Sequence, residues 1–359
     1  MNEALLHLRP HLNAVKETKS ISSFISRRGL AAFSAAVAAI LTIVSGGMPA
    51  SAQTMTPVTM RVDVFFYGSH VPILYGIVGG IYKKYGLDVT AQTGRGSATT
   101  IQTVAAGTDQ FGFADGGTLV KFAAQGLQAK QILGILQTSP AIILSMPEAG
   151  IKSPKDLMGR KGGFGNGSAP EQIFPALLKA AGVDGSSIQR VGVDIPTRDS
   201  LFIQKQIDFS FGYTVAQLPL MEEKCACKLN IIAYSAYGLN PIANGIIVST
   251  KYANENPDVT KRFAMATAEA IDAAVKSPDK AVDAFFEYAK GTQLSRTVVS
   301  KQWDETIKLL HTEATKGKPT GVMDARDWQK SIDLLVQYAD VPKGVVKPEM
   351  VFTNEYLVK

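Results

Sequence analysis

The segment from Val64 to Gly86, VFFYGSHVPILYGIVGGIYKKYG, constrains the fold most because it combines two kinds of periodicity. It begins with an apolar run typical of a short strand, breaks at Gly68, Ser69 and His70, and continues with apolar residues at helical spacing. Gly86 is expected to end the helix. Such a segment places the first-turn N–H groups of the helix at the carboxyl edge of a sheet, where open α/β sheets bind small molecules. A strand, turn and helix also begin α/β proteins of many functions, so the segment alone predicts a fold and no function.

The first 52 residues are expected to be a cleaved signal peptide. Arg27 and Arg28 precede an apolar run at 30–44, and Pro49 to Ala52 ends in an Ala-x-Ala cleavage site. The run is too short for a permanent membrane span. Export to the periplasm is therefore predicted, by the ordinary route or, given the paired arginines, by the twin-arginine route.

The mature chain has a composition that argues against nucleic-acid binding and against a metal cage. The first 52 residues carry five of the 37 Lys and Arg residues and two of the 31 Asp and Glu residues, so the net charge falls from +6 to +3. Its histidines and cysteines are His70, His311, Cys225 and Cys227, too few for a His/Cys site. No metal and no cofactor is predicted. The two cysteines are expected to be free thiols or a strained surface disulfide.

Strands alternate with helices from residue 64 to residue 249, which predicts an α/β fold with mainly parallel sheets. Two similar segments, 109–115 and 208–213, indicate two lobes built on similar plans. Ser97 is expected to be a helix N-cap, and Ser168 with Glu171 a capping box. After residue 249 only helices are expected, at 257–275, 278–289, 300–314 and 324–338.

The lobes are predicted to comprise residues 53–143 with 248–359, which include the C-terminal helices, and residues 144–247. The chain crosses between them in two apolar strands, at about 141–146 and 245–249. Two such crossings make a hinge, so the cleft between the lobes is expected to close on a ligand.

Several short motifs, in this order, resemble the periplasmic substrate-binding proteins of ATP-binding-cassette importers, in the branch for nitrate, alkanesulfonates, taurine and thiamine pyrimidine precursors. They are Ser69–Ile73, Tyr85–Val89, Ala106–Phe113, Gly150–Leu157 and Phe352–Leu357. The resemblance implies a type II periplasmic binding fold with two lobes and a hinge of two crossover strands. It also implies a monomer that captures a small molecule and delivers it to an inner-membrane permease driven by a separate ATPase.

The branch for thiamine pyrimidine precursors also includes fungal enzymes that consume their own active-site histidine, and His70 occupies a matching place. Those enzymes have a cysteine-rich cluster before the second hinge strand, whereas residues 237–245 here contain no cysteine. The chain is therefore predicted not to be an enzyme. The alternatives are a pyrimidine-forming enzyme that uses His70 and a ligand-sensing protein that docks on a receptor.

The cleft is expected to take polar groups from both lobes. The candidates from the first lobe are Tyr67, Ser69, His70, Gly96, Ser97, Thr99, Asp115, Gly116 and Gly117. The candidates from the second lobe are Asn166, Gly167, Ser168, Arg198, Tyr213 and Thr214.

These groups fit more than one ligand chemistry. Helix N-termini at Ser97 and Ser168 suit a carboxylate, sulfonate or phosphate, whereas Asp115 suits an amine or aminopyrimidine. Tyr67 and Tyr213 can stack on a flat ring. A small heteroaromatic compound is preferred to nitrate. Each group also has a structural alternative: a plain cap for the serines, a pair with Asp199 or another surface acid for Arg198, and a structural role for His70.

Overall fold

The computed structural model describes residues 55–165 and 167–357. The chain from Thr54 to Lys359 forms one compact unit. The predicted signal peptide and the candidate Asn166 lie outside the described residues. None of the described helices combines the length and apolar character needed to cross a bilayer.

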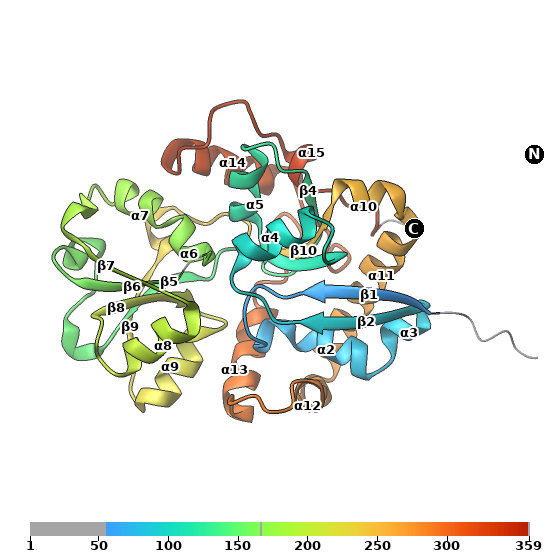
Figure 1. The fold of residues 1–359 in the computed structure, drawn as a ribbon, viewed down its shortest axis with the longest axis horizontal. Coiled ribbons are helices and arrows are strands. Elements are labelled where there is room, and N and C mark those ends of the chain that lie inside the picture. The colour runs from blue at the N-terminus through green and yellow to red at the C-terminus, as the bar shows by residue number, and fades with distance from the viewer. Residues whose placement is uncertain (1–54, 166, 358–359) are drawn as a thin grey trace, which may run out of the picture. The chain divides into compact units, whose positions relative to one another are not determined.

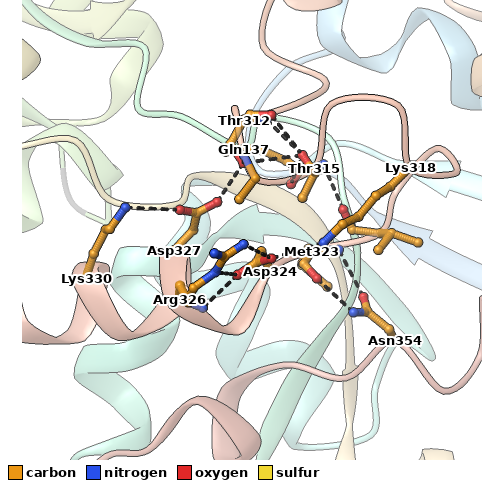
Figure 2. A network of polar contacts seen from close by, with 12 residues as sticks. Gln137, Thr312, Thr315, Lys318, Met323, Asp324, Arg326, Asp327, Lys330 and Asn354 are labelled. Carbon is orange, nitrogen blue, oxygen red and sulfur yellow. Dashed lines mark hydrogen bonds and ion pairs between the residues drawn. The ribbon is translucent and has the colours of Figure 1, made fainter.

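The first sheet has the strand order β2-β1-β3-β10-β4. Its strands β1 and β2 lie side by side (Figure 1). Its strands are β1 (Thr56–Arg61), β2 (Leu87–Gln92), β3 (Phe111–Asp115), β4 (Ala129–Gly134) and β10 (Asn244–Ser249). β1 pairs in parallel with β2 and β3, and β10 runs antiparallel between β3 and β4. Every residue of β3 and β10 is buried, because helices cover both faces at the centre of the sheet.

The second sheet repeats this plan with the order β7-β6-β8-β5-β9. Its strands are β5 (Ala141–Ser145), β6 (Lys161–Gly165), β7 (Gln189–Val193), β8 (Phe209–Tyr213) and β9 (Asn230–Ala233). β6 pairs in parallel with β7 and β8, and β5 runs antiparallel between β8 and β9. β3 and β8, which lie within the two similar segments, therefore occupy equivalent places. The mainly parallel, two-lobed α/β fold predicted from the sequence is confirmed.

We call the elements on the first sheet the first lobe and those on the second sheet the second lobe. The predicted crossing strands, β5 and β10, each pair wholly within one sheet. The chain passes between the sheets in residues 135–140 and 234–243, just before each of these strands. The strand that follows each linker runs opposite to both of its neighbours in the sheet that it enters, so β5 and β10 are the antiparallel strands. The exact domain boundaries, at 143/144 and 247/248, stay a prediction.

The opening segment differs from its prediction in two respects. The strand lies earlier, at β1, where Val58 and Met60 alternate inward, and residues 62–67 form a loop. The helix is divided into α2 (Val71–Val78) and α3 (Ile81–Lys84). Gly80 divides them because it adopts a left-handed conformation with φ of 72°. Gly86 follows α3, as expected.

The remaining helices of the first lobe up to the C-terminal group are η1 (Gly68–His70), α4 (Ser97–Ala105), α5 (Gly116–Ala123) and α10 (Thr250–Glu255). The second lobe has η2 (Pro147–Ala149), η3 (Pro154–Leu157), α6 (Ala169–Gln172), α7 (Phe174–Ala180), η4 (Gly185–Ser187), α8 (Ile195–Ile203) and α9 (Gln217–Cys225), and η5 (Tyr234–Tyr237) lies in the second linker. A disulfide joins Cys225 to Cys227 where α9 ends, with Ala226 in a left-handed conformation.

Three of the four predicted C-terminal helices are confirmed within one residue, whereas the helix predicted at 300–314 lies earlier, at Arg296–Ile307, and a short helix at Pro348–Val351 was not predicted. The C-terminal helices are α11 (Pro257–Lys276), α12 (Pro278–Tyr288), α13 (Arg296–Ile307), α14 (Ala325–Tyr338) and α15 (Pro348–Val351). α11 and α12 pack on α2, α13 packs on η1, and α14 and α15 pack on α5. They therefore extend the first lobe, while α13 also contacts α9 and α14 contacts α7 of the second lobe.

Candidate functional site

Two adjoining cavities lie between loops of the two lobes. The smaller, which we call the inner pocket, has a volume of about 30 Å³. The larger, which we call the outer cleft, has about 590 Å³ and shares Val64 and Ile195 with the inner pocket. The inner pocket is lined by Asp63, Val64, Tyr67, Gly96, Ser97, Ser168, Ala169, Pro170, Ile195, Arg198, Gly212, Tyr213, Ala216 and Gln217. Both sheets present their strand ends here, the position at which α/β proteins bind ligands.

Asp63 provides the carboxylate of the first lobe. It lies just beyond the carboxyl end of β1 and is only 5% exposed. Its Oδ2 accepts hydrogen bonds from Tyr67 Oη at 3.3 Å and from Asn244 Nδ2 at 3.0 Å. Burial, followed by the neighbouring Asp63, raises the pKa of Tyr67 well above its usual value, so the phenol stays protonated and donates.

His70 lies behind this carboxylate and lines neither cavity. Its Nδ1 accepts from the backbone N–H of Tyr67 at 3.2 Å. Its Nε2 is 3.2 Å from Asp63 Oδ1, without the alignment of a hydrogen bond. The ring packs edge-on against Tyr67 and Phe113 and is fully buried. The sequence left packing and ligand contact open for His70, and this geometry supports a packing role.

Ser69 also points away from the cavities. Its hydroxyl lies 2.8 Å from Thr306 Oγ1 on α13, and both residues are fully buried. The polar turn thus attaches the first lobe's opening loop to a C-terminal helix. Sequence spacing cannot reveal this contact because the two residues are 237 positions apart.

The start of α4 brings two predicted residues to the inner pocket. Gly96, and not Ser97, is the N-cap, with φ of 119°, and its N–H donates to the Asp63 carbonyl at 2.5 Å. Ser97 begins the helix, and its Oγ accepts from the backbone N–H of Asp115 at 3.2 Å. The expected cap at Ser97 is therefore wrong by one residue, because the tight turn before α4 needs a positive φ that glycine adopts readily. Thr99 lines the outer cleft.

Asp115, at the end of β3, is the N-cap of α5. Its Oδ1 accepts from the N–H and the hydroxyl of Thr118, at 2.6 and 2.8 Å. Burial raises the pKa of Asp115 to about 6 despite these hydrogen bonds. Asp115, Gly116 and Gly117 line neither cavity, so Asp115 acts on the pocket from behind, through its charge.

Arg198 is the cation at the inner pocket and is 1% exposed. Its Nε and Nη2 donate to Asp199 Oδ1 at 3.1 and 2.9 Å, and its Nη1 donates to Glu171 Oε1 at 2.8 Å. Burial opposes the charged guanidinium, but Asp199 and Glu171 together raise the pKa of Arg198. Burial raises the pKa of both carboxyl groups, and the pairing with Arg198 opposes that rise. The pairing with Asp199 considered from the sequence is thus present, together with lining of the pocket.

Glu171 therefore accepts a hydrogen bond from Arg198 instead of completing the predicted capping box with Ser168. The side chain of Ser168 makes no capping hydrogen bond at the start of α6, although it lines the inner pocket. The predicted box fails because a buried guanidinium competes for the Glu171 carboxylate, and a charge-assisted pair outweighs a cap.

Tyr213 ends β8 and lines the inner pocket with 6% exposure. Its hydroxyl is buried and has no hydrogen-bond partner among the described residues. Burial, followed by Asp115, raises the pKa of Tyr213 well above its usual value, so the group is a protonated donor. Thr214 lines neither cavity; its N–H donates to the Pro140 carbonyl in the first linker at 3.0 Å.

The lobes meet directly at the rim of the pocket. The N–H of Ala98 donates to the Gly167 carbonyl at 3.3 Å. A Cβ on Gly96 would lie 2.5 Å from that carbonyl oxygen, so only glycine permits this approach. Gly167 itself lines neither cavity but forms this contact.

Sequence reasoning missed several lining residues, chiefly Asp63, Ile195 and Gln217. Asp63 directly precedes the apolar run that the sequence indicates as a strand from Val64, whereas the strand in the structure ends at Arg61. Asp194, the N-cap of α8, and the Ile-Pro that follows it are a helix-start signal that could have located Ile195. Gln217 begins α9, where its Oε1 accepts from the Tyr213 N–H at 3.2 Å.

The described residues contain no cluster of three or more His, Cys, Asp or Glu side chains positioned to hold a metal ion. The pocket instead presents hydrogen-bonding groups: the carboxylate of Asp63, the hydroxyls of Tyr67 and Tyr213, and the amide of Gln217. Such a set can orient a small polar molecule by hydrogen bonds.

Known proteins resemble the chain over most of its length. A riboflavin-binding protein, RibY, of Chloroflexus aurantiacus is 23% identical over 86% of this chain and 88% of its own. A 4-amino-5-hydroxymethyl-2-methylpyrimidine phosphate synthase of Legionella pneumophila is 22% identical over 76% of this chain and 84% of its own. The alkanesulfonate-binding protein SsuA of Xanthomonas axonopodis pv. citri, solved with MOPS, superposes with a TM-score of 0.64 at 13% identity. That alignment covers 83% of this chain and 99% of SsuA.

The family model described as NMT1/THI5 like matches residues 68–281, which include the turn at Ser69 and His70, both linkers and every second-lobe residue of the inner pocket. The match extends over more than half of the sequence. The chain therefore belongs to the NMT1/THI5-like family.

Proposed function

We propose that this protein is the extracytoplasmic solute-binding component of an importer, which captures a small organic molecule between its lobes and presents it to a permease. The permease would sit in the inner membrane and work with a separate ATPase, and the protein would act in the periplasm as a monomer. The family, the two-lobed fold and relatives named as binding proteins support this proposal.

The observation that carries the proposal is the buried hydroxyl of Tyr213, which has no hydrogen-bond partner in the described part of the chain and lies at a pocket lined by both lobes. A buried donor without a partner costs roughly 1–3 kcal/mol, so a ligand that accepts its hydrogen bond is favoured. Because lining residues come from both lobes, a ligand in the pocket would stabilise the closed arrangement.

The charges favour a neutral or cationic heteroaromatic ligand, such as a thiamine pyrimidine precursor, over a sulfonate or nitrate. Arg198 already donates from all three nitrogens to Asp199 and Glu171. Asp63 pairs with no lysine or arginine among the described residues and can accept from an amino group. In the inner pocket an anion would meet the carboxylate of Asp63, and the cation there, Arg198, is already paired. Arg95 lines the outer cleft and would face only the part of a ligand that extends there.

The inner pocket is smaller than an aromatic ring. A ligand of that size would extend into the outer cleft or require the lobes to separate. The hydrogen bond from Ala98 to Gly167 at the rim is one of the contacts that such a separation would break.

Native mass spectrometry of the protein, purified without denaturation, tests the proposal. A retained molecule of defined mass is expected, and the affinity of the amino-pyrimidine probe 4-amino-5-hydroxymethyl-2-methylpyrimidine should exceed that of an alkanesulfonate. Tyr213→Phe should weaken the retained molecule's binding by about 1 kcal/mol, roughly fivefold. Tyr82→Phe is the matched control, because it removes a buried hydroxyl that is hydrogen-bonded to Thr267 and lies outside the pocket. Equal binding by both variants would contradict the proposed site.

A pyrimidine-forming enzyme is the second candidate, since His70 lies 3.2 Å from Asp63 beside the pocket and one relative is named as a synthase. Its signature is different. Turnover would change the mass of the peptide that carries His70, and the activity would require iron. A bound molecule with an unmodified His70 peptide supports the binding protein, whereas an empty protein with a modified peptide supports the enzyme.

A further inference from the structure

α13 lies between the two lobes, and its faces have different partners. Val299 and Trp303 pack in an apolar cluster with Val71 and Leu74 of α2, which fixes the helix to the first lobe. Val298, on another face, is buried with residues of the second lobe. Those residues are Ile142, Leu144, Met146, Phe202, Ile207, Leu220 and Met221. The N-cap Ser295 donates from its hydroxyl to Glu223 of α9 at 2.6 Å.

Gln302 is a fully buried polar residue near the centre of this helix. Its Oε1 accepts from the backbone N–H of Gly68 in the first lobe at 2.9 Å. Its Nε2 donates to the carbonyl of Ala216 in the second lobe at 2.7 Å. One donor and one acceptor on opposite sides fix the orientation of the amide, because the reverse orientation would oppose like groups.

Both backbone partners of Gln302 adjoin the inner pocket. Gly68 follows Tyr67, and Ala216 lines the pocket between Tyr213 and Gln217. Gly68 approaches α13 so closely that a Cβ would lie 2.2 Å from Gln302 Cβ. The side chain therefore joins the pocket-forming loop of one lobe to that of the other without itself lining the pocket.

We infer that Gln302 is a positioning residue that holds the two pocket walls in register and sets the free energy of lobe closure. The inference rests on the proposed ligand capture for its biological purpose. The closure it describes is nevertheless a property of the protein alone. A methionine at this position fills the same space but leaves the Gly68 N–H and the Ala216 carbonyl without partners, which favours separation of the lobes.

Hydrogen exchange measured residue by residue by NMR can detect this separation without any ligand. The N–H of Ala98 bonds across the lobes to Gly167, so its exchange rate reports closure directly. Gln302→Met should accelerate exchange at both Gly68 and Ala98 by about tenfold relative to the wild type. Gln302→Glu keeps an acceptor for Gly68 but directs a second oxygen at the Ala216 carbonyl. It should therefore accelerate Ala98 while Gly68 stays protected.

Thr306→Val is the matched control, one turn further along α13. It removes a buried hydrogen bond to Ser69 within the first lobe and leaves the contact to Ala216 intact. Exchange in the core of α11 reports global stability in all variants. If Ala98 accelerates only as much as the α11 core, or as much in Thr306→Val as in Gln302→Met, the inference is overturned. Because these outcomes need no ligand, they are independent of whether mass spectrometry finds a bound molecule.

Discussion

The two walls of the inner pocket each carry a buried charge, but the charges are held in opposite ways. In the first lobe, Asp63 accepts from Tyr67 Oη, Asn244 Nδ2 and the backbone N–H of Val64, and His70 Nε2 lies 3.2 Å from its Oδ1. In the second lobe, Arg198 is held by two carboxylates, Asp199 and Glu171. A charged residue that lines a pocket is therefore not necessarily a ligand contact. A charge whose partners already neutralise it supports the fold, whereas one held by neutral dipoles retains attraction for a ligand.

The contrast arises although the lobes share one sheet topology. β3 and β8 occupy the same place in their sheets and end at Asp115 and Tyr213, respectively. Asp115 caps a helix and lines neither cavity, whereas Tyr213 lines the pocket with a hydroxyl that bonds to none of the residues 55–165 and 167–357. A common plan thus determines where polar residues gather, while the neighbouring loops determine which of them meet the cavity.

The largest effect is expected from removing Arg198, the cation that is paired with two carboxylates in the second-lobe wall of the pocket. Arg198→Met leaves Glu171 and Asp199 buried without their cation, which should lower the free energy of unfolding by about 3–5 kcal/mol at pH 7. Urea unfolding followed by circular dichroism measures this loss. Because both acids have raised pKa values, the loss should shrink as the pH falls and they become protonated. Weak ligand binding at unchanged stability would mean that Arg198 is mainly a ligand contact.

The next effect concerns Asp115, whose pKa of about 6 is above its ordinary value of 3.8. Between pH 4 and 6 the folded protein therefore binds more protons than the unfolded chain, and stability falls as the pH rises. Asp115→Asn keeps an acceptor for Thr118 but abolishes this titration. The variant should gain up to about 3 kcal/mol relative to the wild type on going from pH 4 to pH 7. Unfolding midpoints measured across this range provide the test, and a difference that does not vary with pH would contradict the raised pKa.

Removing the charge of Asp63, in the first-lobe wall of the pocket, is expected to change stability least but to weaken binding clearly. Asp63→Asn removes the charge while Tyr67 and Asn244 keep an acceptor. It should weaken binding of the molecule found by mass spectrometry by about 1.5–3 kcal/mol. Isothermal titration calorimetry measures the change.

Asp109→Asn is the control for that variant, since Asp109 is a buried acid paired with Arg61 and lies outside the pocket. It should lower stability and leave affinity unchanged. If the two variants weaken binding equally, the charge of Asp63 has no special role at the pocket, and the comparison between the two walls fails.

Much of the fold was predictable because it depends on residues close together in the chain. The alternation of strands and helices, the Gly86 stop and the C-terminal helices follow from apolar spacing and end signals. Of the site, sequence reasoning identified Tyr67, Gly96, Ser97, Ser168 and Tyr213 among the lining residues, because each stands where a strand or helix begins or ends. Arg198, which it also identified, lies inside α8.

The sequence by itself determined that two α/β lobes with a glycine-rich, polar edge would form, since periodicity and turn chemistry act over three or four residues. Only the tertiary structure decided which polar groups remain free. Glu171 pairs with Arg198, 27 residues away, instead of completing a cap, and the Ser69 hydroxyl contacts Thr306. Asp63 lines the pocket because β1 ends at Arg61, two residues before it. The partner of a buried charge depends on which groups lie near it in space and on the free-energy cost of leaving the charge unpaired. Neither can be inferred from the neighbouring residues in the sequence.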